Sequence, residues 1–410
     1  MKILIINVYS NTRSTGKIAY SLLNYLRNKG HTVKLCCRGT RESMPQDEDI
    51  IGLDNIFSTY RAAFLSRVTG IEGRWNSSGT HKLIHLIEDF NPDIVQIYSL
   101  HGYYINHYKL LDYLKRHDIP TVYSMIDEFP YMGKCCYSYE CNQFKSECKK
   151  CPNGRWREYP ESWFFDRSNI IFHLKQEAYQ DFKHIVFTGP KWVVIRAKES
   201  TLLRNKVVKE LDEPIDYTRY MYPRATSKLR KSLSIDKQQK VILTVSDMRY
   251  WRKGGKYFLQ TAERLMGEKD IVFVAIGYNK AVNYPVPQNV ITIPFVKSQD
   301  ELAEFYSLAD LFVCTSLADT MPNVCLEALG CGTPLAGFAE CGTPYCAYNE
   351  LGRFTKTYDI DSLVEVVKSS PYKDKELSEK CVSYAHNRYS SEAVFSKLTN
   401  IYKELINTKL

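Results

Sequence analysis

The sequence has no apolar stretch that approaches the ~18 residues of a membrane-spanning helix. It also has no block of five or more like charges, which argues against a nucleic-acid-binding tail. The apolar run after Lys2 is too short and wrongly flanked for a signal peptide. We therefore expect a cytoplasmic protein that touches a membrane, if at all, only at its surface.

The composition shows none of the bias of a disordered, collagen-like or coiled-coil chain, because 44% of the 410 residues are hydrophobic and 25% are charged. At ~150 residues per domain, this length predicts two to three domains. Thirteen cysteines in a long chain without a signal peptide are expected to be thiols or metal ligands before they are disulfides.

Basic residues are missing from one segment, since residues 301–350 contain seven acids and no Lys or Arg. The rest of the chain is basic: residues 1–200 carry 27 basic and 21 acidic residues, and residues 201–300 carry 18 and 10. This excess favours an anionic partner, which could be nucleic acid, an anionic leaflet or a phosphorylated substrate. An ordinary solvated surface with a mild excess of charge explains it equally well.

Short apolar runs alternate with longer helical patterns, which is typical of parallel sheets covered by helices on both faces. One series predicts strands near residues 2–9, 32–37, 93–98, 121–126 and 184–189, with helices near 17–29, 80–90 and 107–117. A second predicts strands near 240–246, 271–277, 290–296, 311–316 and 333–338, with helices near 255–266, 299–309 and 323–329. We therefore expect an α/β protein with two Rossmann-like, doubly wound domains, residues 1–215 and 216–390, facing a cleft. A last helix, within 391–410, could pack back on the first domain.

The turn after the first strand lacks the G-x-G-x-x-G fingerprint of dinucleotide-binding domains, because residues 7–17 contain a single glycine, Gly16. Ser14 or Thr15 could cap the following helix, and Gly16 would let a ligand approach the amides at its start. A capped helix start without a ligand is an equally good interpretation.

The strongest chemical signal lies in residues 316–334. A strand ends near Ser316, and Pro322 suits the first turn of the next helix, where no N–H is needed. The free amides of Asn323 and Val324 could then hold a diphosphate or sugar hydroxyls. Glu327 lies four residues after Asn323 and so on the same helical face, one turn deeper and in reach of a ribose diol.

Asp319 and Glu327 are separated by seven residues, and Glu327 begins the run Glu-Ala-Leu-Gly-Cys-Gly-Thr-Pro. This segment resembles the retaining glycosyltransferases of the GT-B fold, family 4. The resemblance covers nearly the whole chain, and the motifs of the first half resemble a subgroup found in capsular and exopolysaccharide biosynthesis clusters. The further motifs are residues 14–18, 100–104, 148–152, 164–168, 245–246, 252–254 and 301–310.

The resemblance implies a hexosyl- or glycosyltransferase that moves a sugar from a nucleotide-diphosphate donor to a glycan, with retention and without a catalytic metal. The second domain would hold the donor and the first the acceptor, a growing glycan on a lipid diphosphate at the inner face of the plasma membrane. In the donor site, Glu327 would hold the ribose, Lys253 and a nearby arginine the diphosphate, and Asp319, Thr320 and the following amides the sugar. His101 and Asp127 would contact sugar or acceptor in the first domain.

The chain departs from the family pattern at four positions. Asp319 stands where many relatives have Glu, which is one methylene longer. Asp247 stands where a basic residue is usual, so the arginine role falls to Arg249 or Arg252. Ile126 replaces a frequent His, which would suit a 6-deoxy sugar or a smaller pocket. Tyr345 replaces a Glu that contacts the donor in some relatives.

A cysteine-rich insertion occupies about residues 130–165. The thiolates of Cys135, Cys141, Cys148 and Cys151 have the spacing of a closed, tetrahedral Zn²⁺ site, with Cys136 spare. Four thiolates leave no open position, so such a zinc would be structural and would stabilise a segment with little core of its own. Buried reduced thiols and an iron–sulfur cluster are the alternatives.

Several other features have more than one interpretation. Asp359 and Asp361 have the spacing of a D-x-D metal site, but the triplet fits better as the cap of a helix that begins at Ser362. Aromatic residues in 156–165 and the pair Tyr103-Tyr104 could stack on sugars, dip into a membrane interface or belong to the core. A zinc-ribbon-containing nucleic-acid-binding protein is the rival from another class, although we expect no nucleic acid partner. An epimerase or phosphorylase on the same scaffold is a second rival.

Overall fold

The computed structural model describes residues 1–39 and 46–409. The chain forms two compact units: unit 1 is Met1–Glu213 together with Val394–Leu410, and unit 2 is Pro214–Ala393. Within the described residues, every helix is too short or too polar to span a bilayer.

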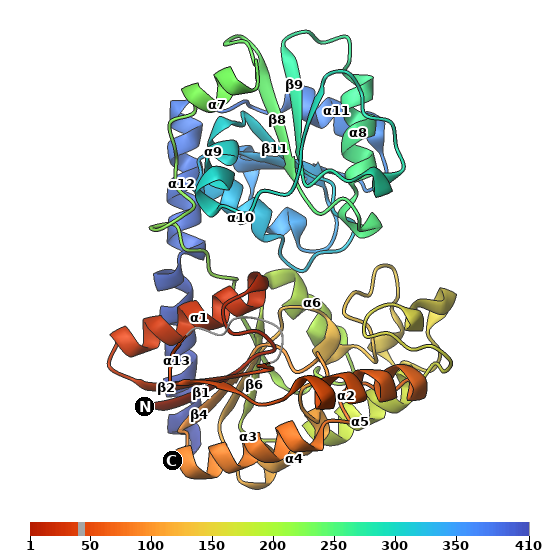
Figure 1. Ribbon diagram of the computed structural model, residues 1–410, viewed down its shortest axis with the longest axis vertical. Helices are drawn as coiled ribbons and strands as arrows, with labels where there is room; N and C mark the ends of the chain where they lie inside the picture. The colour runs from red at the N-terminus through yellow and green to blue at the C-terminus, as the bar shows by residue number, and fades with distance from the viewer. Residues whose placement is uncertain (40–45, 410) are drawn as a thin grey trace. The chain divides into compact units, whose positions relative to one another are not determined.

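Unit 1 is built on a parallel sheet of seven strands in the order β3-β2-β1-β4-β5-β6-β7 (Figure 1). In β1, Ile3 and Ile5 join the core on one face of the sheet, and Leu4 and Ile6 join the core on the other. Four consecutive apolar residues are needed because helices cover both faces of a parallel sheet. The strands are β1 Lys2–Ile6, β2 Thr32–Cys37, β3 Ile50–Gly52, β4 Ile94–Ile97, β5 Thr121–Ser124, β6 Ile185–Gly189 and β7 Val207–Glu210.

The C-terminal helix α13, Ser391–Lys409, belongs to unit 1 over most of its length. Phe395 and Leu398 enter the same core as Leu22 of α1, and the Tyr402 hydroxyl donates a 2.9 Å hydrogen bond to the buried side chain of Gln96 in β4. The helices of unit 1 are α1 Arg13–Asn28, α2 Ile56–Thr69, α3 Ser77–Phe90, α4 His107–Arg116, α5 Ser168–Tyr179 and α6 Lys191–Glu199, besides α13.

Unit 2 repeats this arrangement with six parallel strands in the order β10-β9-β8-β11-β12-β13. Its strands are β8 Lys240–Val245, β9 Ile271–Ile276, β10 Val290–Ile293, β11 Leu311–Cys314, β12 Leu335–Phe338 and β13 Gly352–Thr355. Its helices are α7 Ser227–Ser232, α8 Gly255–Arg264, α9 Gln299–Leu308, α10 Asn323–Gly330, α11 Ile360–Ser369 and α12 Lys375–Tyr389. The expectation of two Rossmann-like, doubly wound domains is thereby confirmed.

The expected start of the first helix is wrong. Helix α1 begins at Arg13 rather than near Lys17, so Ser14 and Thr15 lie in its first turn and do not cap it. Gly16 is buried inside this turn, where an added Cβ would lie 2.8 Å from the Cβ of Tyr9. This crowding alone explains the glycine, because the helix start packs tightly against the end of its preceding loop.

Candidate functional site

The site expected in unit 2 lies where its strand order reverses. Strands β8 and β11 pair with each other, and the strands that follow each of them extend the sheet in opposite directions. In open α/β sheets, ligands bind outside the carboxyl ends of the strands at such a switch point. The loops that follow β8 and β11 therefore lie where a ligand of unit 2 would bind.

These two loops are joined by backbone contacts. The amide of Leu317 donates a 2.6 Å hydrogen bond to the carbonyl of Arg252, and the Thr315 hydroxyl donates one of 2.9 Å to the carbonyl of Gly254. Gly254 has a φ of +68°, and an added Cβ would lie only 1.8 Å from the carbonyl oxygen of Thr315. The close approach therefore requires glycine, and it places Arg252 and Lys253 beside the loop that carries Asp319.

Asp319 is the centre of an ion-pair cluster. Its Oδ2 accepts hydrogen bonds from Lys253 Nζ at 2.7 Å and from the Ser316 hydroxyl at 2.6 Å, and its Oδ1 lies 3.5 Å from Arg252 Nη1. Burial by itself raises the pKa of Asp319, but the charges of Lys253 and Arg252 outweigh burial and hold this pKa below its ordinary value. The carboxylate therefore stays ionised and fixes both cations at the edge of the sheet.

Helix α10 carries the other residues that are expected to bind the nucleotide-sugar donor. Asn323, Val324 and Glu327 keep part of their surface exposed, whereas the remaining residues of the helix are buried. The hydroxyl of Tyr306, a fully buried residue of α9, donates a 2.8 Å hydrogen bond to Oε2 of Glu327. This bond fixes the carboxylate on the face that carries Asn323, one turn along the helix, as the sequence spacing predicts.

The structure separates the two arginines that the sequence left as alternatives. Arg249 is exposed and forms a two-point ion pair with Asp247, with N···O distances of 2.8 and 2.6 Å. Arg252 instead donates to the carbonyl of Ala318 at 3.1 Å and lies beside Asp319. Arg252 is therefore the arginine that joins Lys253 in the cluster.

Sequence reasoning missed Gly342, which supports the Asp319 loop from behind. Its amide donates a 2.9 Å hydrogen bond to the carbonyl of Asp319. An added Cβ on Gly342 would lie 1.7 Å from the carbonyl oxygen of the buried residue Thr320. The only signal in the sequence is the short Cys-Gly-Thr-Pro turn after β12, which by itself does not indicate a contact with residue 319.

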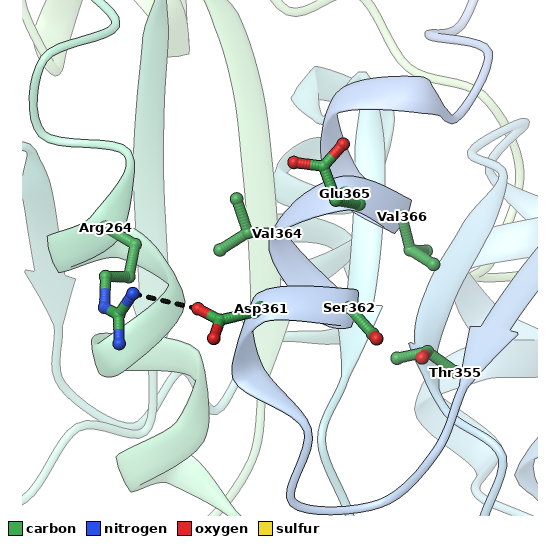
Figure 2. Close-up of a pocket in the computed structure, with 7 residues that line it drawn as sticks. All are labelled: Arg264, Thr355, Asp361, Ser362, Val364, Glu365 and Val366. Atoms are coloured by element: carbon green, nitrogen blue, oxygen red, sulfur yellow. Dashed lines mark hydrogen bonds and ion pairs between the residues drawn. The ribbon is translucent and has the colours of Figure 1, made fainter.

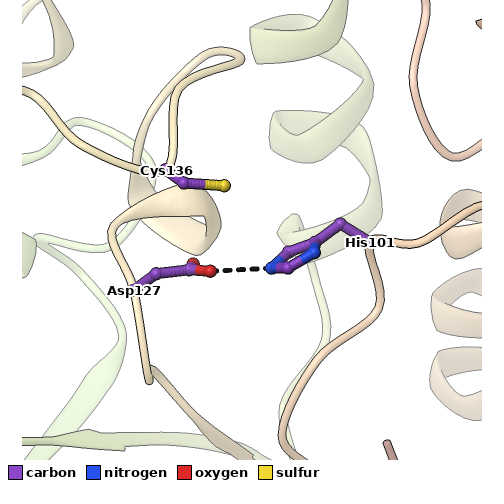
Figure 3. Close-up of side chains that lie close together, drawn as sticks. All are labelled: His101, Asp127 and Cys136. Atoms are coloured by element: carbon purple, nitrogen blue, oxygen red, sulfur yellow. Dashed lines mark hydrogen bonds and ion pairs between the residues drawn. The ribbon is translucent and has the colours of Figure 1, made fainter. Parts of the chain in front are cut away.

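Unit 1 brings together the other two candidates. His101 Nε2 lies 2.7 Å from Oδ2 of Asp127 (Figure 3), and His101 Nδ1 lies 3.0 Å from the hydroxyl of Tyr159. Burial lowers the pKa of His101, but the charge of Asp127 and the hydrogen bond to it outweigh burial and raise this pKa above its ordinary value. The two residues form a positioned acid–base pair, which the sequence named only as separate candidates.

Cys136 lies beside this pair, with its Sγ within 4.8 Å of the facing atoms of His101 and Asp127 (Figure 3). A nitrogen, an oxygen and a sulfur at this separation could ligate a transition metal ion. The four cysteines expected to bind zinc do not form such a group among the described residues. The thiols of Cys135 and Cys151 do hydrogen-bond to each other, and burial raises the pKa of Cys148 to about 12. The zinc site stays a prediction.

A hollow of about 610 Å³ in unit 2 is lined by residues of α8, α11 and β13 (Figure 2). An exposed ion pair crosses it, with Arg264 Nη1 2.8 Å from Asp361 Oδ1. Helix α11 is capped by Asp359, which accepts a 2.9 Å hydrogen bond from the amide of Ser362. Asp359 therefore caps the helix, as expected, but the helix begins at Ile360 rather than at Ser362, so Asp361 lies in its first turn and forms an ion pair that the sequence did not predict.

Both halves of the chain match models of glycosyltransferase domains. Residues 15–196 match the model described as Glycosyltransferase Family 4, and residues 225–388 match the model described as Glycosyl transferases group 1. Each match falls within one of the two units.

Three relatives have known names. N-acetyl-alpha-D-glucosaminyl L-malate synthase of Bacillus anthracis is 21% identical over 54% of this chain and 60% of its own length. Alpha-galactosylglucosyldiacylglycerol synthase of Streptococcus pneumoniae (strain ATCC BAA-255 / R6) is 26% identical over 42% and 48%. A glycosyl transferase named for colanic acid biosynthesis, WcaC of Escherichia coli (strain K12), is 21% identical over 68% and 67%. The chain thus matches about half to two thirds of the length of these relatives.

Solved structures share the fold over nearly the whole chain. Sucrose-phosphate synthase from Thermosynechococcus elongatus has a TM-score of 0.68 at 12% identity, with 99% of each chain covered. Anabaena Alr3699/HepE, solved in complex with UDP, has a TM-score of 0.64 at 12% identity, with 98% of this chain and 100% of that chain covered. The chain therefore has the GT-B fold, with a domain that matches Glycosyltransferase Family 4 in unit 1 and a domain that matches Glycosyl transferases group 1 in unit 2.

Proposed function

We propose that the protein transfers a sugar, with retention of its anomeric configuration, from a nucleotide-diphosphate donor to a glycan acceptor. The observation that carries this proposal is the cluster of Lys253 and Arg252 around Asp319, at the point where the strand order of unit 2 reverses. Cations and the amides at the start of a helix are the groups that bind a diphosphate, and here both lie next to the Asp319 loop.

In the proposed reaction, the bond between the sugar's anomeric carbon and the diphosphate oxygen breaks, and a bond from the acceptor oxygen to the same carbon forms on the same face. The acceptor proton passes to the departing diphosphate. Negative charge grows on the leaving group as its bond breaks, so Lys253 and Arg252 stabilise the transition state more than the bound donor. These cations are already positioned by Asp319, which reduces the reorganisation that the reaction requires.

Glu327 is proposed to accept hydrogen bonds from the ribose hydroxyls. Tyr306 holds Oε2 in place, and Glu327 keeps part of its surface exposed. The amides of Thr320, Asn323 and Val324 are proposed to bind the diphosphate and the transferred sugar. A nucleotide-sugar donor is consistent with the UDP complex of the Anabaena neighbour.

The acceptor is proposed to bind in unit 1, where His101 and Asp127 form the positioned pair. A lipid-linked glycan destined for a cell-surface polysaccharide is the acceptor that the relatives favour. The pneumococcal relative is named for a glycolipid and the Escherichia coli relative for colanic acid. Such an acceptor places the protein at the inner face of the plasma membrane.

The proposal is tested by incubating the protein with labelled nucleotide sugars and a lipid extract, and by measuring both label in the lipid fraction and released nucleoside diphosphate. We expect equal amounts of both, and an NMR coupling constant that reports the donor's anomeric configuration in the product. Glu327→Ala is expected to abolish transfer, whereas Glu365→Ala, which removes an exposed carboxylate of α11, is the matched control.

The same experiment separates the rival enzymes. An epimerase would release nucleotide without an acceptor, and a phosphorylase, which acts on glycan and inorganic phosphate, would neither label the lipid nor release nucleoside diphosphate. Either result, or transfer that survives Glu327→Ala at the wild-type rate, contradicts the proposal.

A further inference from the structure

Three kinds of metal ligand meet in unit 1 at the carboxyl ends of two neighbouring strands. His101 lies in the loop after β4 and Asp127 in the loop after β5, and these two strands pair in parallel. Cys136 comes from the cysteine-rich insertion. Its Sγ, a ring nitrogen of His101 and a carboxylate oxygen of Asp127 all lie within 4.8 Å of one another (Figure 3). Among the described residues, no other three metal-ligating side chains lie this close together.

The backbone holds two of these side chains in place. The amide of Phe129 donates a 3.0 Å hydrogen bond to Oδ1 of Asp127, while Oδ2 faces His101. The amide of Glu128, the residue after Asp127, donates a 3.2 Å hydrogen bond to the carbonyl of Cys136. The loop of Cys136 is therefore tied to the loop of Asp127, so the thiol and the carboxylate keep their separation before any ion binds.

His101 has the outer partner that a metal-bound histidine needs. Its Nε2 faces Asp127, and its Nδ1 lies 3.0 Å from the hydroxyl of Tyr159. When Nε2 binds a metal ion, Nδ1 carries the proton and donates it to this hydroxyl oxygen. Such a second hydrogen bond fixes the tautomer and the orientation of the ring.

The buried charges of this region leave the Asp127 carboxylate free of lysine. Glu72, a second carboxylate, is 1% exposed and accepts a 3.3 Å hydrogen bond from the amide that follows His101. The buried lysines Lys134 and Lys175 both donate to backbone carbonyls, at 2.7 Å and at 2.9 and 3.1 Å. Asp127 pairs with His101 instead. A metal ion therefore has to replace only the hydrogen bond between these two residues.

We propose that Cys136, His101 and Asp127 bind a Zn²⁺ ion, at a site separate from the four cysteines that are expected to hold a structural zinc. Sulfur, nitrogen and oxygen together suit Zn²⁺, whereas Mg²⁺ and Ca²⁺ take oxygen ligands. Tetrahedral bonds of about 2.0–2.3 Å place ligand atoms roughly 3.3–3.6 Å apart, so shifts of about 1 Å bring the three atoms into ligation. Binding releases the proton of the Cys136 thiol to solvent. We call these three residues the mixed-ligand site.

Three protein ligands leave the fourth position of a tetrahedral ion open to water. An ion in the mixed-ligand site would occupy both members of the acid–base pair, His101 and Asp127, and keep them from the acceptor. Zinc is therefore expected to inhibit sugar transfer and to leave nucleoside diphosphate binding in unit 2 unchanged. This inhibitory role rests on the proposed function, whereas metal binding itself does not.

The first experiment counts zinc ions by equilibrium dialysis of the full chain as purified, so that the four-cysteine site keeps any metal that it holds. Wild type is expected to bind one ion more than Cys136→Ser or His101→Gln. Tyr159→Phe keeps all three ligands but loses the outer partner, and is expected to bind the ion roughly tenfold more weakly. Cys36→Ser and His81→Gln change a buried cysteine and an exposed histidine elsewhere in unit 1, and these matched controls are expected to bind zinc like wild type.

Cobalt tests whether the thiol and the histidine bind the same ion. A Co²⁺ ion bound to a thiolate has a charge-transfer absorption in the near ultraviolet, and His101→Gln removes no thiol. We expect His101→Gln to lose the same part of this absorption as Cys136→Ser, because one ion joins both side chains. Thermal unfolding of each variant confirms that it folds.

Two results would overturn the mixed-ligand site: wild type that binds no more zinc than the two ligand variants, or a cobalt–thiolate absorption in His101→Gln that equals that of wild type. Zinc that binds at this site without inhibiting transfer would overturn the inhibitory role. Absence of transfer without zinc would contradict the proposed function, and the zinc counts would still decide whether the site exists.

Discussion

Lys253 Nζ lies 2.7 Å from Oδ2 of Asp319, although 65 residues separate the two in the chain. The contact joins the loops that follow two paired strands, β8 and β11, and it is largely shielded from solvent. A carboxylate that holds a lysine and an arginine keeps both cations in place before a ligand arrives. A diphosphate that binds in unit 2 would meet these two cations already in position.

The two arginines after β8 are expected to differ in their effect on nucleotide binding. Arg252→Ala removes a cation of the Asp319 cluster and is expected to weaken nucleoside diphosphate binding by about 1.5–3 kcal/mol, roughly tenfold to a hundredfold. Arg249→Ala removes a guanidinium that is already bound to Asp247 and is expected to change the Kd less than threefold, within about 0.5 kcal/mol. Titration calorimetry of both variants measures the difference. If both variants lose the same affinity for the nucleotide, Arg252 has no larger part in binding than Arg249.

Asp319→Asn is expected to lower the free energy of unfolding by about 2 kcal/mol near neutral pH, because it leaves two cations without their carboxylate. The pKa of Asp319 is lower in the folded protein than in the unfolded chain. Its contribution to stability is therefore present above the unfolded pKa of about 3.9 and is lost as the pH falls through the lower, folded value. Urea unfolding of wild type and Asp319→Asn at several pH values should show that the difference in their free energies of unfolding becomes smaller below about pH 4. A difference that is constant from neutral pH to acid would rule out ionised Asp319 as the cause.

Gly342→Ala is expected to destabilise the protein by about 2–3 kcal/mol, because the new methyl group would overlap the carbonyl of Thr320 and displace the loop of Asp319. Gly267→Ala is the control, since an added Cβ there has no heavy atom within 4 Å, and we expect no loss of stability. Chemical unfolding measures both changes. If Gly342→Ala unfolds like its control, the close packing behind the loop is not present in solution.

Metal analysis tests the cysteine-rich insertion. We expect about one zinc per chain in protein purified without chelator, held by the four cysteines that the sequence spacing indicates. Cys148→Ser is expected to lose this metal and to unfold at a lower temperature, because binding of a structural zinc contributes to folding. Cys36→Ser changes a buried cysteine outside the insertion and should keep the metal. If wild type contains no zinc and Cys148→Ser unfolds at the same temperature as wild type, these thiols are core residues and not metal ligands.

The central strands are predictable from the sequence, whereas of the edge strands only β10 was predicted. Strands β1, β8 and β9 are buried apolar runs and were predicted within three residues of their observed ends. Strands β3 and β13 are edge strands of only three and four residues, and Ile50 is their single buried side chain, so the hydrophobic pattern does not reveal them. Helix α12 escaped detection because its buried stripe, Leu377, Cys381, Ala385 and Tyr389, is sparse among charged residues.

The candidate site shows the same division. The spacing of Asn323 and Glu327 places them on one helical face, which is a local property that the sequence contains. The contacts of Asp319 with Lys253 and of Glu327 with Tyr306 join residues far apart in the chain, and only the folded sheet brings them together. Spacing alone therefore could not choose between Arg249 and Arg252, nor join His101 to Asp127.

The central claim is that unit 2 binds a nucleoside diphosphate through Asp319 and Glu327, and thermal unfolding against UDP, GDP, dTDP, ADP, NAD and a short oligonucleotide tests it most directly. A ligand at ~100 times its Kd adds about 2.7 kcal/mol of stability. We predict that one nucleoside diphosphate raises the unfolding temperature of wild type and of Glu365→Ala but not of Glu327→Ala. A shift only with the oligonucleotide, no shift with any nucleotide, or an equal shift in Glu327→Ala would contradict the account.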